Sequence, residues 1–261
     1  MCAILVGVTS SFLSTATTER VAILDVDPEL AQRLRGTRHE RARRVSVARV
    51  LHRGAGLWDA NQDAAHGRDG LGLLVVEGVL VRRVGLEGRF GAELLSVGDL
   101  LQPAEHDGVE ATLPFEATWR VLSPLRFAVL DLDWMARMAP FPEVAAEITR
   151  RVMIRSRRLA SMLAIAQHHR LEDRLRLFFW ELADRYGRVG SDGVRLELAL
   201  THELIGHLVG AHRPSVSTAL ARLEHGGYIR RRGHTWLLLG AAPGLRELID
   251  EDALGDKPPS T

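Results

Sequence analysis

The sequence predicts an α+β protein in which an N-terminal antiparallel β-roll of the jelly-roll type is followed by a long dimerisation helix and a smaller C-terminal unit. Three observations support this fold class. Apolar, β-branched runs broken by glycine turns begin at Leu71. A helical stretch with proline in its first turn begins at Pro142. Two short helical patterns separated by a tight turn follow from Thr201, before a hairpin-like segment.

The composition restricts the class of protein. A chain of 261 residues can bury two modest hydrophobic cores. Its net charge of +1 shows no overall preference for polyanions, so a nucleic-acid surface must come from local clusters of arginine. Cys2 is the single cysteine, which excludes a disulfide framework, a thiolate zinc site and a four-cysteine iron–sulfur cluster. We expect no secretory signal, no membrane partner and a cytoplasmic location.

The pattern along the chain divides it into five expected segments. These are a leader (1–20), a sensor-like β-roll domain (21–141), a dimerisation helix (142–170), a C-terminal domain with two helices and a hairpin (171–243) and a disordered tail (244–261). The tail is acidic and then rich in proline and serine, which is typical of disorder.

The long helix has an imperfect 3.5-residue repeat of apolar positions. The repeat places Ile148, Val152, Leu159, Met162 and Ala166 on one seam, together with Arg155 and His169. We interpret this seam as the contact of a coiled-coil-like homodimer. The alternative is a helix buried on its own barrel.

The stretch HELIGH resembles at first sight the H-E-x-x-H helix of zinc peptidases. In that motif the two histidines are four residues apart and lie about 40° apart on one helix face. His202 and His207 are five residues apart, so they diverge by about 140°. A regular helix cannot direct both at one ion. We therefore expect no metal and no catalytic residue, and a metal-dependent hydrolase built on this His/Glu cluster is the alternative reading.

The same stretch fits two helices joined by a tight turn. Thr201 is suited to cap the first helix, and Gly210 tolerates the positive φ of the turn. Pro214 falls in the first turn of the second helix, where its missing N–H costs little. The expected buried positions are Leu204, Ile205, Leu208 and Val209 on the first helix and Val216, Ala219, Leu220 and Leu223 on the second. Glycines 226–227 end that helix, and a hairpin around Gly233 follows, so the sequence predicts a winged helix-turn-helix.

From about Arg174 to Leu239 the chain resembles the DNA-binding domain of the Crp/Fnr regulators, because LTHELIGHLVGAHRPSVSTALARLEHGGYI matches the signature of that family almost throughout. The order of β-roll, long helix and winged helix is similar too. The resemblance implies a transcription regulator that binds a near-palindromic operator in double-stranded DNA as a homodimer. RNA polymerase is a further candidate partner, although the sequence singles out no contact for it.

The resemblance also implies roles for residues of the winged helix. Arg213 would read guanine with its guanidinium fork, and Ser217 and Thr218 would contact bases or a thymine methyl group. The expected phosphate contacts are Thr201, His212, Ser215, Arg230, Arg231 and Arg232. Pro214 and Thr218 stand where several members have a glutamate and a second base-reading arginine, so the operator is expected to differ from theirs. A winged helix that binds a protein partner remains an alternative.

The region after the turn at Gly98 and Asp99 lacks the residues that bind a cyclic nucleotide in this family. Such members have a Gly-Glu pair just after the turn and then an arginine, whereas the next arginine here is Arg120. The similar segment FGAELL, residues 90–95, precedes the turn, where it should form a strand. We expect no cyclic nucleotide and no cofactor. The residues that bind an effector are unknown.

Overall fold

The computed structural model describes residues 19–243 except 65, 68, 103–112 and 114. Nearly all of the expected leader (1–20) and all of the expected tail (244–261) lie outside the described residues. Among the residues that the structure does describe, no helix is both long enough and apolar enough to cross a membrane.

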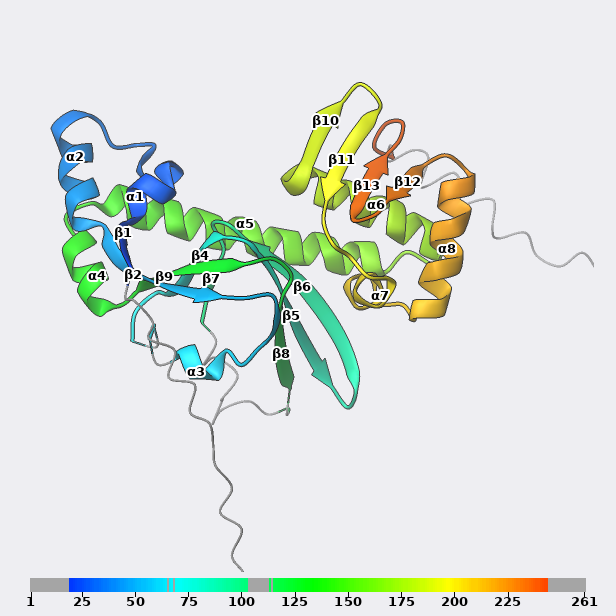
Figure 1. Ribbon diagram of the computed structural model, residues 1–261, viewed down its shortest axis with the longest axis horizontal. Helices are drawn as coiled ribbons and strands as arrows, with labels where there is room; N and C mark the ends of the chain where they lie inside the picture. Colours follow the sequence, from blue (N-terminus) through cyan, green and yellow to red (C-terminus); the bar gives the residue numbers. More distant parts are fainter. Residues whose placement is uncertain (1–18, 65, 68, 103–112, 114, 244–261) are drawn as a thin grey trace, which may run out of the picture.

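The N-terminal part is a roll of two antiparallel sheets, as the sequence predicts (Figure 1). One sheet has the strand order β1-β2-β9-β4-β7 and the other has the order β3-β8-β5-β6. The strands are β1 (Arg20–Ala22), β2 (Val47–Arg53), β3 (Gly56–Trp58), β4 (Gly72–Glu77), β5 (Val79–Leu86), β6 (Arg89–Ser96), β7 (Leu100–Leu101), β8 (Glu116–Val121) and β9 (Leu125–Leu130).

Aromatic side chains fill the space between the two sheets. Trp58 stacks on Phe127 with ring centroids 4.9 Å apart and meets Trp119 edge-on at 5.6 Å. Both sheets contribute buried aliphatic residues to the same cluster. The interior of the roll is therefore occupied by its own side chains.

Short helices and the first part of the long helix cover the other side of the five-stranded sheet (Figure 1). They are α1 (Ile23–Val26), the 3-10 turn η1 (Pro28–Ala31), α2 (Gly36–Val45) and α4 (Leu132–Met138), while α3 (Asn61–Ala64) follows β3. Their buried residues pack with Val144 and Ile148 of the long helix α5 (Pro142–Ala166). This packing fixes the rotation of α5 about its axis.

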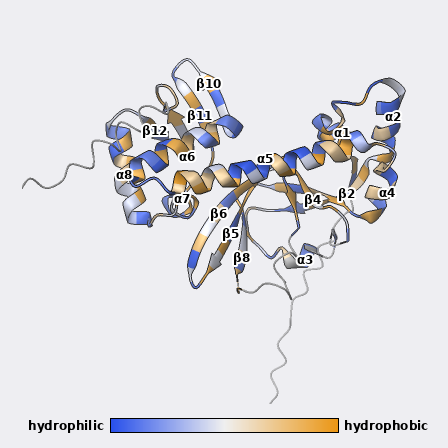
Figure 2. Ribbon diagram, turned by 180° about the vertical axis from the view of Figure 1, so that it is seen from behind, coloured by the Kyte–Doolittle hydropathy of each residue, from blue (hydrophilic) through white to orange (hydrophobic). Residues whose placement is uncertain are grey.

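Helix α5 begins at Pro142, the expected position, and hydrophobic and hydrophilic residues alternate along it (Figure 2). Its exposed apolar stripe differs from the expected seam. Ile148 is 5% exposed, because it belongs to the N-terminal core, so its placement on a surface seam was wrong. Arg155 bonds to Glu93 of the roll. The exposed apolar residues are Val152, Met153, Leu159 and Leu163, and Leu163 is the most exposed at 69%. The stripe is thus turned away from the roll by part of a helical turn.

The C-terminal part is a winged helix-turn-helix with a four-stranded sheet, β10-β11-β13-β12. Its elements are α6 (Leu171–Tyr186), β10 (Gly187–Gly190), β11 (Gly193–Glu197), α7 (His202–Val209), α8 (Arg213–His225), β12 (Ile229–Arg232) and β13 (Thr235–Leu238). Strands β10 and β11 form an antiparallel hairpin with a turn at residues 191–192. Val81 and Leu94 of the roll belong to the same buried cluster as this domain.

Candidate nucleic-acid interface

The turn between α7 and α8 is built as its residues predict. The Thr201 hydroxyl accepts a hydrogen bond from the Leu204 amide at 3.1 Å and so caps α7. Gly210 has φ 68°, and the Ala211 amide donates to the Gly206 carbonyl at 2.8 Å. The guanidinium of Arg174 donates to the Val209 carbonyl at 3.2 Å. Arg174 therefore helps to hold the turn, a role that no local pattern indicated.

Helix α8 presents a polar face to solvent. Pro214 lies in its first turn, and the four expected apolar positions of its inner face are buried. The side chains at its start that were assigned to DNA are accessible: His212, Arg213, Ser215 and Thr218 are exposed, and Ser217 is half-buried. The first turn of α8 can therefore reach a ligand without any rearrangement of the domain.

Hydrogen bonds connect the wing to α7 and α8 through His202. Arg231 Nη1 lies 3.1 Å from His202 Nε2, and His202 Nδ1 lies 2.8 Å from Ser217 Oγ. A guanidinium can only donate, so Nε2 accepts and Nδ1 carries the proton. Ser217 Oγ in turn donates to the Arg213 carbonyl at 3.1 Å. Burial, and then the charges of Arg231 and Arg213, lower the pKa of His202, which favours this neutral form.

The wing carries three exposed arginines, of which one packs against the domain and two lie on the other side of the strand. Arg230 and Arg232 alternate with Arg231 along β12, so their side chains leave the strand on the opposite side. The guanidinium of Arg231 lies 4.7 Å from the centre of the Trp236 ring and donates to the Gly233 carbonyl. Arg231 is thus held by the domain itself.

His207 faces a different part of the molecule from His202. Its Nε2 lies 3.4 Å from Arg83 Nη2, and its ring meets Phe90 edge-on at 6.5 Å, so it contacts the β5–β6 hairpin of the roll. Burial and Arg83 lower the pKa of His207. The two imidazoles diverge as their five-residue spacing predicts. Within the described part of the chain, no cluster of three or more His, Cys, Asp or Glu side chains is arranged to hold a metal ion.

A model of the Crp-like helix-turn-helix domain matches residues 173–248. The CRP-like cAMP-activated global transcriptional regulator of Mycobacterium tuberculosis is 30% identical over 126 residues, which are 48% of this chain and 56% of that protein. The transcriptional regulatory protein btr of Bordetella pertussis is 32% identical over 105 residues, which are 40% of this chain and 43% of that protein. The chain thus spans about half the length of the curated relatives it matches.

Two solved structures share the fold across both parts of the molecule. A CooA mutant from Carboxydothermus hydrogenoformans has a TM-score of 0.58 and 19% identity, covering 78% of this chain and 87% of that one. FixK2 from Bradyrhizobium japonicum has a TM-score of 0.53 and 17% identity, covering 78% of this chain and 96% of that one. Residues 173–248 thus match a Crp-like helix-turn-helix domain, and the chain shares its overall fold with these two structures.

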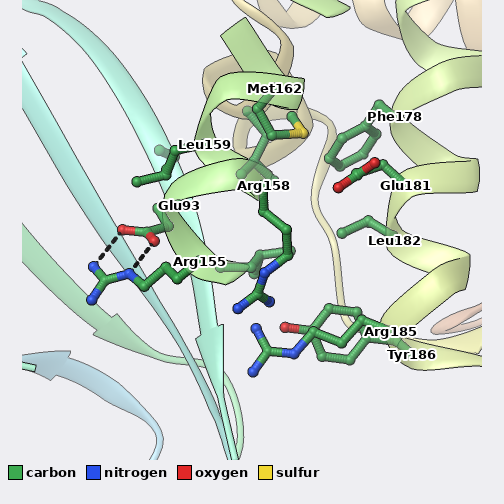
Figure 3. A pocket seen from close by; sticks show the side chains of 13 residues that line it. Glu93, Arg155, Arg158, Leu159, Met162, Phe178, Glu181, Leu182, Arg185 and Tyr186 are labelled. Carbon is green, nitrogen blue, oxygen red and sulfur yellow. Dashed lines mark hydrogen bonds and ion pairs between the residues drawn. The ribbon is translucent and has the colours of Figure 1, made fainter. Parts of the chain in front are cut away.

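Two carboxylates of the roll each pair with two arginines. Residues 90–95 lie in strand β6, as expected, and Glu93 of that strand bonds to Arg82 at 3.0 Å and to Arg155 of α5 at 2.6 and 2.9 Å (Figure 3). Asp99 is 4% exposed and pairs with Arg158 of α5 at 3.0 Å and Arg185 of α6 at 2.8 Å. Most of the segment that follows the turn lies outside the described residues.

Proposed function

We propose that this chain is a sequence-specific DNA-binding transcription regulator of the Crp/Fnr family, acting in the cytoplasm as a homodimer on a near-palindromic operator, and not an enzyme. One observation carries the proposal. The start of α8 is exposed, and the hydrogen bonds from Arg231 through His202 and Ser217 to the Arg213 carbonyl fix its position against the wing.

In this proposal Arg213 reads a guanine, because its exposed guanidinium can donate two parallel hydrogen bonds to O6 and N7. Ser217 and Thr218 have a narrower role than the sequence implied. Their hydroxyls donate to the carbonyls of Arg213 and Pro214 at 3.1 and 3.2 Å. They would therefore meet a base as acceptors, or, for Thr218, through its methyl group.

The expected phosphate contacts surround this point. Thr201 and His212 precede the two helices, Ser215 lies in the first turn of α8, and Arg230 and Arg232 project from the wing. The positive end of the α8 dipole favours an anion at the same place. Arg231 contacts Trp236 and so supports the wing. Its Nε and Nη1 already donate to Gly233 and His202, so only its remaining N–H donors could bind a phosphate.

The homodimer would form along the exposed stripe of α5. Val152, Met153, Leu159 and Leu163 are 46%, 54%, 37% and 69% exposed, which is unusual for four large apolar residues of one helix. Burying this stripe against a second copy would remove apolar surface from water. The pairing would also place two α8 helices for a two-fold symmetric operator.

We further propose that neither cyclic AMP nor an iron–sulfur cluster gates the protein. Between the roll and α5, Glu93 pairs with both Arg82 and Arg155. Aromatic rings fill the interior of the roll. Calorimetry with cyclic AMP and cyclic GMP tests the first part, and saturable heat with either nucleotide would overturn it.

The test of the main proposal is selection of the purified full chain on a randomised duplex library, followed by sequencing of the retained DNA. We expect a near-palindrome with a guanine in each half. Arg213→Ala should lose preference at that guanine, worth ~1–3 kcal/mol. Arg222→Ala is the matched control, because Arg222 is exposed on the same helix but pairs with Glu172 at 2.8 Å. Retention without any motif would contradict the proposal and favour a protein partner.

A further inference from the structure

A cavity of about 60 Å³ lies where β6, α5 and α6 meet (Figure 3). Met162 and Phe178 lie at one end of it, and the guanidinium groups of Arg158 and Arg185 lie close together at the other. Since one water needs ~10–15 Å³, the cavity holds about four to six water-sized groups. The cavity is therefore amphipathic and small.

Its basic end has more positive than negative charge. Four arginines (Arg82, Arg155, Arg158 and Arg185) share the two carboxylates of Glu93 and Asp99, so four charges minus two leave a formal excess of two. Glu181 in the cavity wall is the remaining acid. Burial, then the charge of Asp184, raises the pKa of Glu181, and when ionised Glu181 reduces the excess to one.

A guanidinium donor of Arg158 at this end is unsatisfied. The Nε of Arg158 is buried and has no hydrogen-bond acceptor among the described residues. A buried donor without a partner costs free energy, so the pairing with Asp99 leaves the guanidinium of Arg158 with unused hydrogen-bonding capacity. The rest of the lining is mostly apolar, with Leu94, Leu159, Leu182 and Leu208 around Met162 and Phe178. An inorganic anion has no apolar group that could contact this apolar part of the lining.

We infer that this cavity binds a short aliphatic carboxylate, with an alkyl chain of about three to five carbon atoms beside Met162 and Phe178 and its carboxylate on Arg158 and Arg185. The walls come from the roll, the long helix and the first helix of the DNA-binding domain. Occupation would change how Asp99 shares Arg158 and Arg185, and hence how the roll holds α6. Only this regulatory consequence rests on the proposed DNA-binding function.

Saturation-transfer NMR with butyrate and the DNA-free full chain tests the inference. We expect saturable binding at millimolar concentration, and butyramide should bind ~10-fold more weakly because it lacks the charge. Ala92→Leu adds atoms to the cavity wall and should weaken butyrate binding ~10-fold or more. Arg158→Gln should weaken it similarly, because the ligand would lose a charged donor.

Two further variants separate a site from a general effect of charge. Glu181→Gln removes the opposing acid and should tighten butyrate binding several-fold, a change that loss of folding cannot mimic. Arg150→Gln is the control, because Arg150 lies on α5 outside this cavity and pairs with Glu147. No saturable binding, or binding unchanged by Ala92→Leu and Glu181→Gln, overturns the inference. Library selection on the same preparation reports separately whether the DNA-binding proposal holds.

Discussion

His202 accepts a hydrogen bond from Arg231 at 3.1 Å, and this contact exists only while Nε2 of the imidazole is unprotonated. Protonation would turn the acceptor into a second donor that faces a guanidinium. The wing and α8 are therefore joined through an imidazole that must stay neutral for the contact to persist.

The stability of the chain should fall on mild acidification. Burial lowers the pKa of His202 and of His207 below the ordinary value of 6.5, so between the lowered pKa and 6.5 the unfolded chain binds more protons than the folded one. The stabilisation is complete above pH 6.5 and is lost as the pH falls through that window. Denaturant unfolding across this pH range measures the loss of stability.

Two variants separate His202 from the other histidines. His202→Gln, which keeps an acceptor and a donor, should give a shallower dependence of stability on pH, while His225→Gln at the exposed end of α8 should follow the parent chain. Identical profiles for all three would contradict the assignment.

The three wing arginines should differ in what their removal costs. Arg230→Ala and Arg232→Ala should each reduce the salt dependence of DNA affinity by about one counterion, with little change in stability. Arg231→Ala should lower the free energy of unfolding by ~1 kcal/mol, because the contact with Trp236 and the bond to His202 are lost. Fluorescence anisotropy over a salt series, with parallel denaturant titrations, distinguishes the two effects. Equal behaviour of the three variants would show that the stacking of Arg231 is immaterial.

A charge in the exposed stripe of α5 should prevent the proposed homodimer from forming. Leu163→Glu places a carboxylate at the most exposed apolar position, so sedimentation should show a monomer. Arg41→Glu introduces the same group at an exposed position on α2, outside the stripe, and should leave the dimer intact.

The buried end of the same helix should respond differently. Ile148→Ala should lower the free energy of unfolding by ~2–5 kcal/mol without dissociating folded chains, because Ile148 packs in the N-terminal core. If Ile148→Ala dissociated the dimer and Leu163→Glu did not, the dimer contact would be the seam that the 3.5-residue repeat predicted.

Gly206 should not tolerate alanine, although it lies inside a helix. Replacing glycine by alanine in an exposed helix interior usually stabilises by about 1 kcal/mol. A Cβ on Gly206 would lie 2.4 Å from the Ala211 carbonyl oxygen, so the chain must shift and we expect a loss of ~1–3 kcal/mol. Gly210→Ala meets no atom within 4 Å and should show only the strain of its positive φ, about 1 kcal/mol. Thermal unfolding of the two variants compares them, and a more stable Gly206→Ala would be the contrary result.

Local chemistry predicted the winged helix well. A threonine cap, a left-handed glycine and a proline in the first turn determine where α7 and α8 begin and end, and each acts within a few residues. The helical spacing of apolar residues likewise predicted the buried faces of α7 and α8, because it depends only on residues within each helix. The fold class could be predicted because the sequence pattern shows the order of strands and helices along the chain.

Long-range contacts explain what the sequence did not reveal. Whether Ile148 faces solvent depends on α1, η1 and α4, which cover the same side of the sheet. Strand β10 forms because residues 193–196 pair with it, and its own composition gave no signal. His202 was weighed only as a metal ligand, since its partners lie 15 and 29 residues away. The cavity is lined by residues of both domains that lie far apart in the sequence.

The buried cluster that contains Val81 and Leu94 of the roll together with the core of the winged helix has a thermodynamic consequence. Melting either part would expose apolar surface of the other, so neither can open without loss of burial in its neighbour. The molecule should accordingly lose its structure in one cooperative transition, and heat absorption in calorimetry should show a single peak instead of one for each domain.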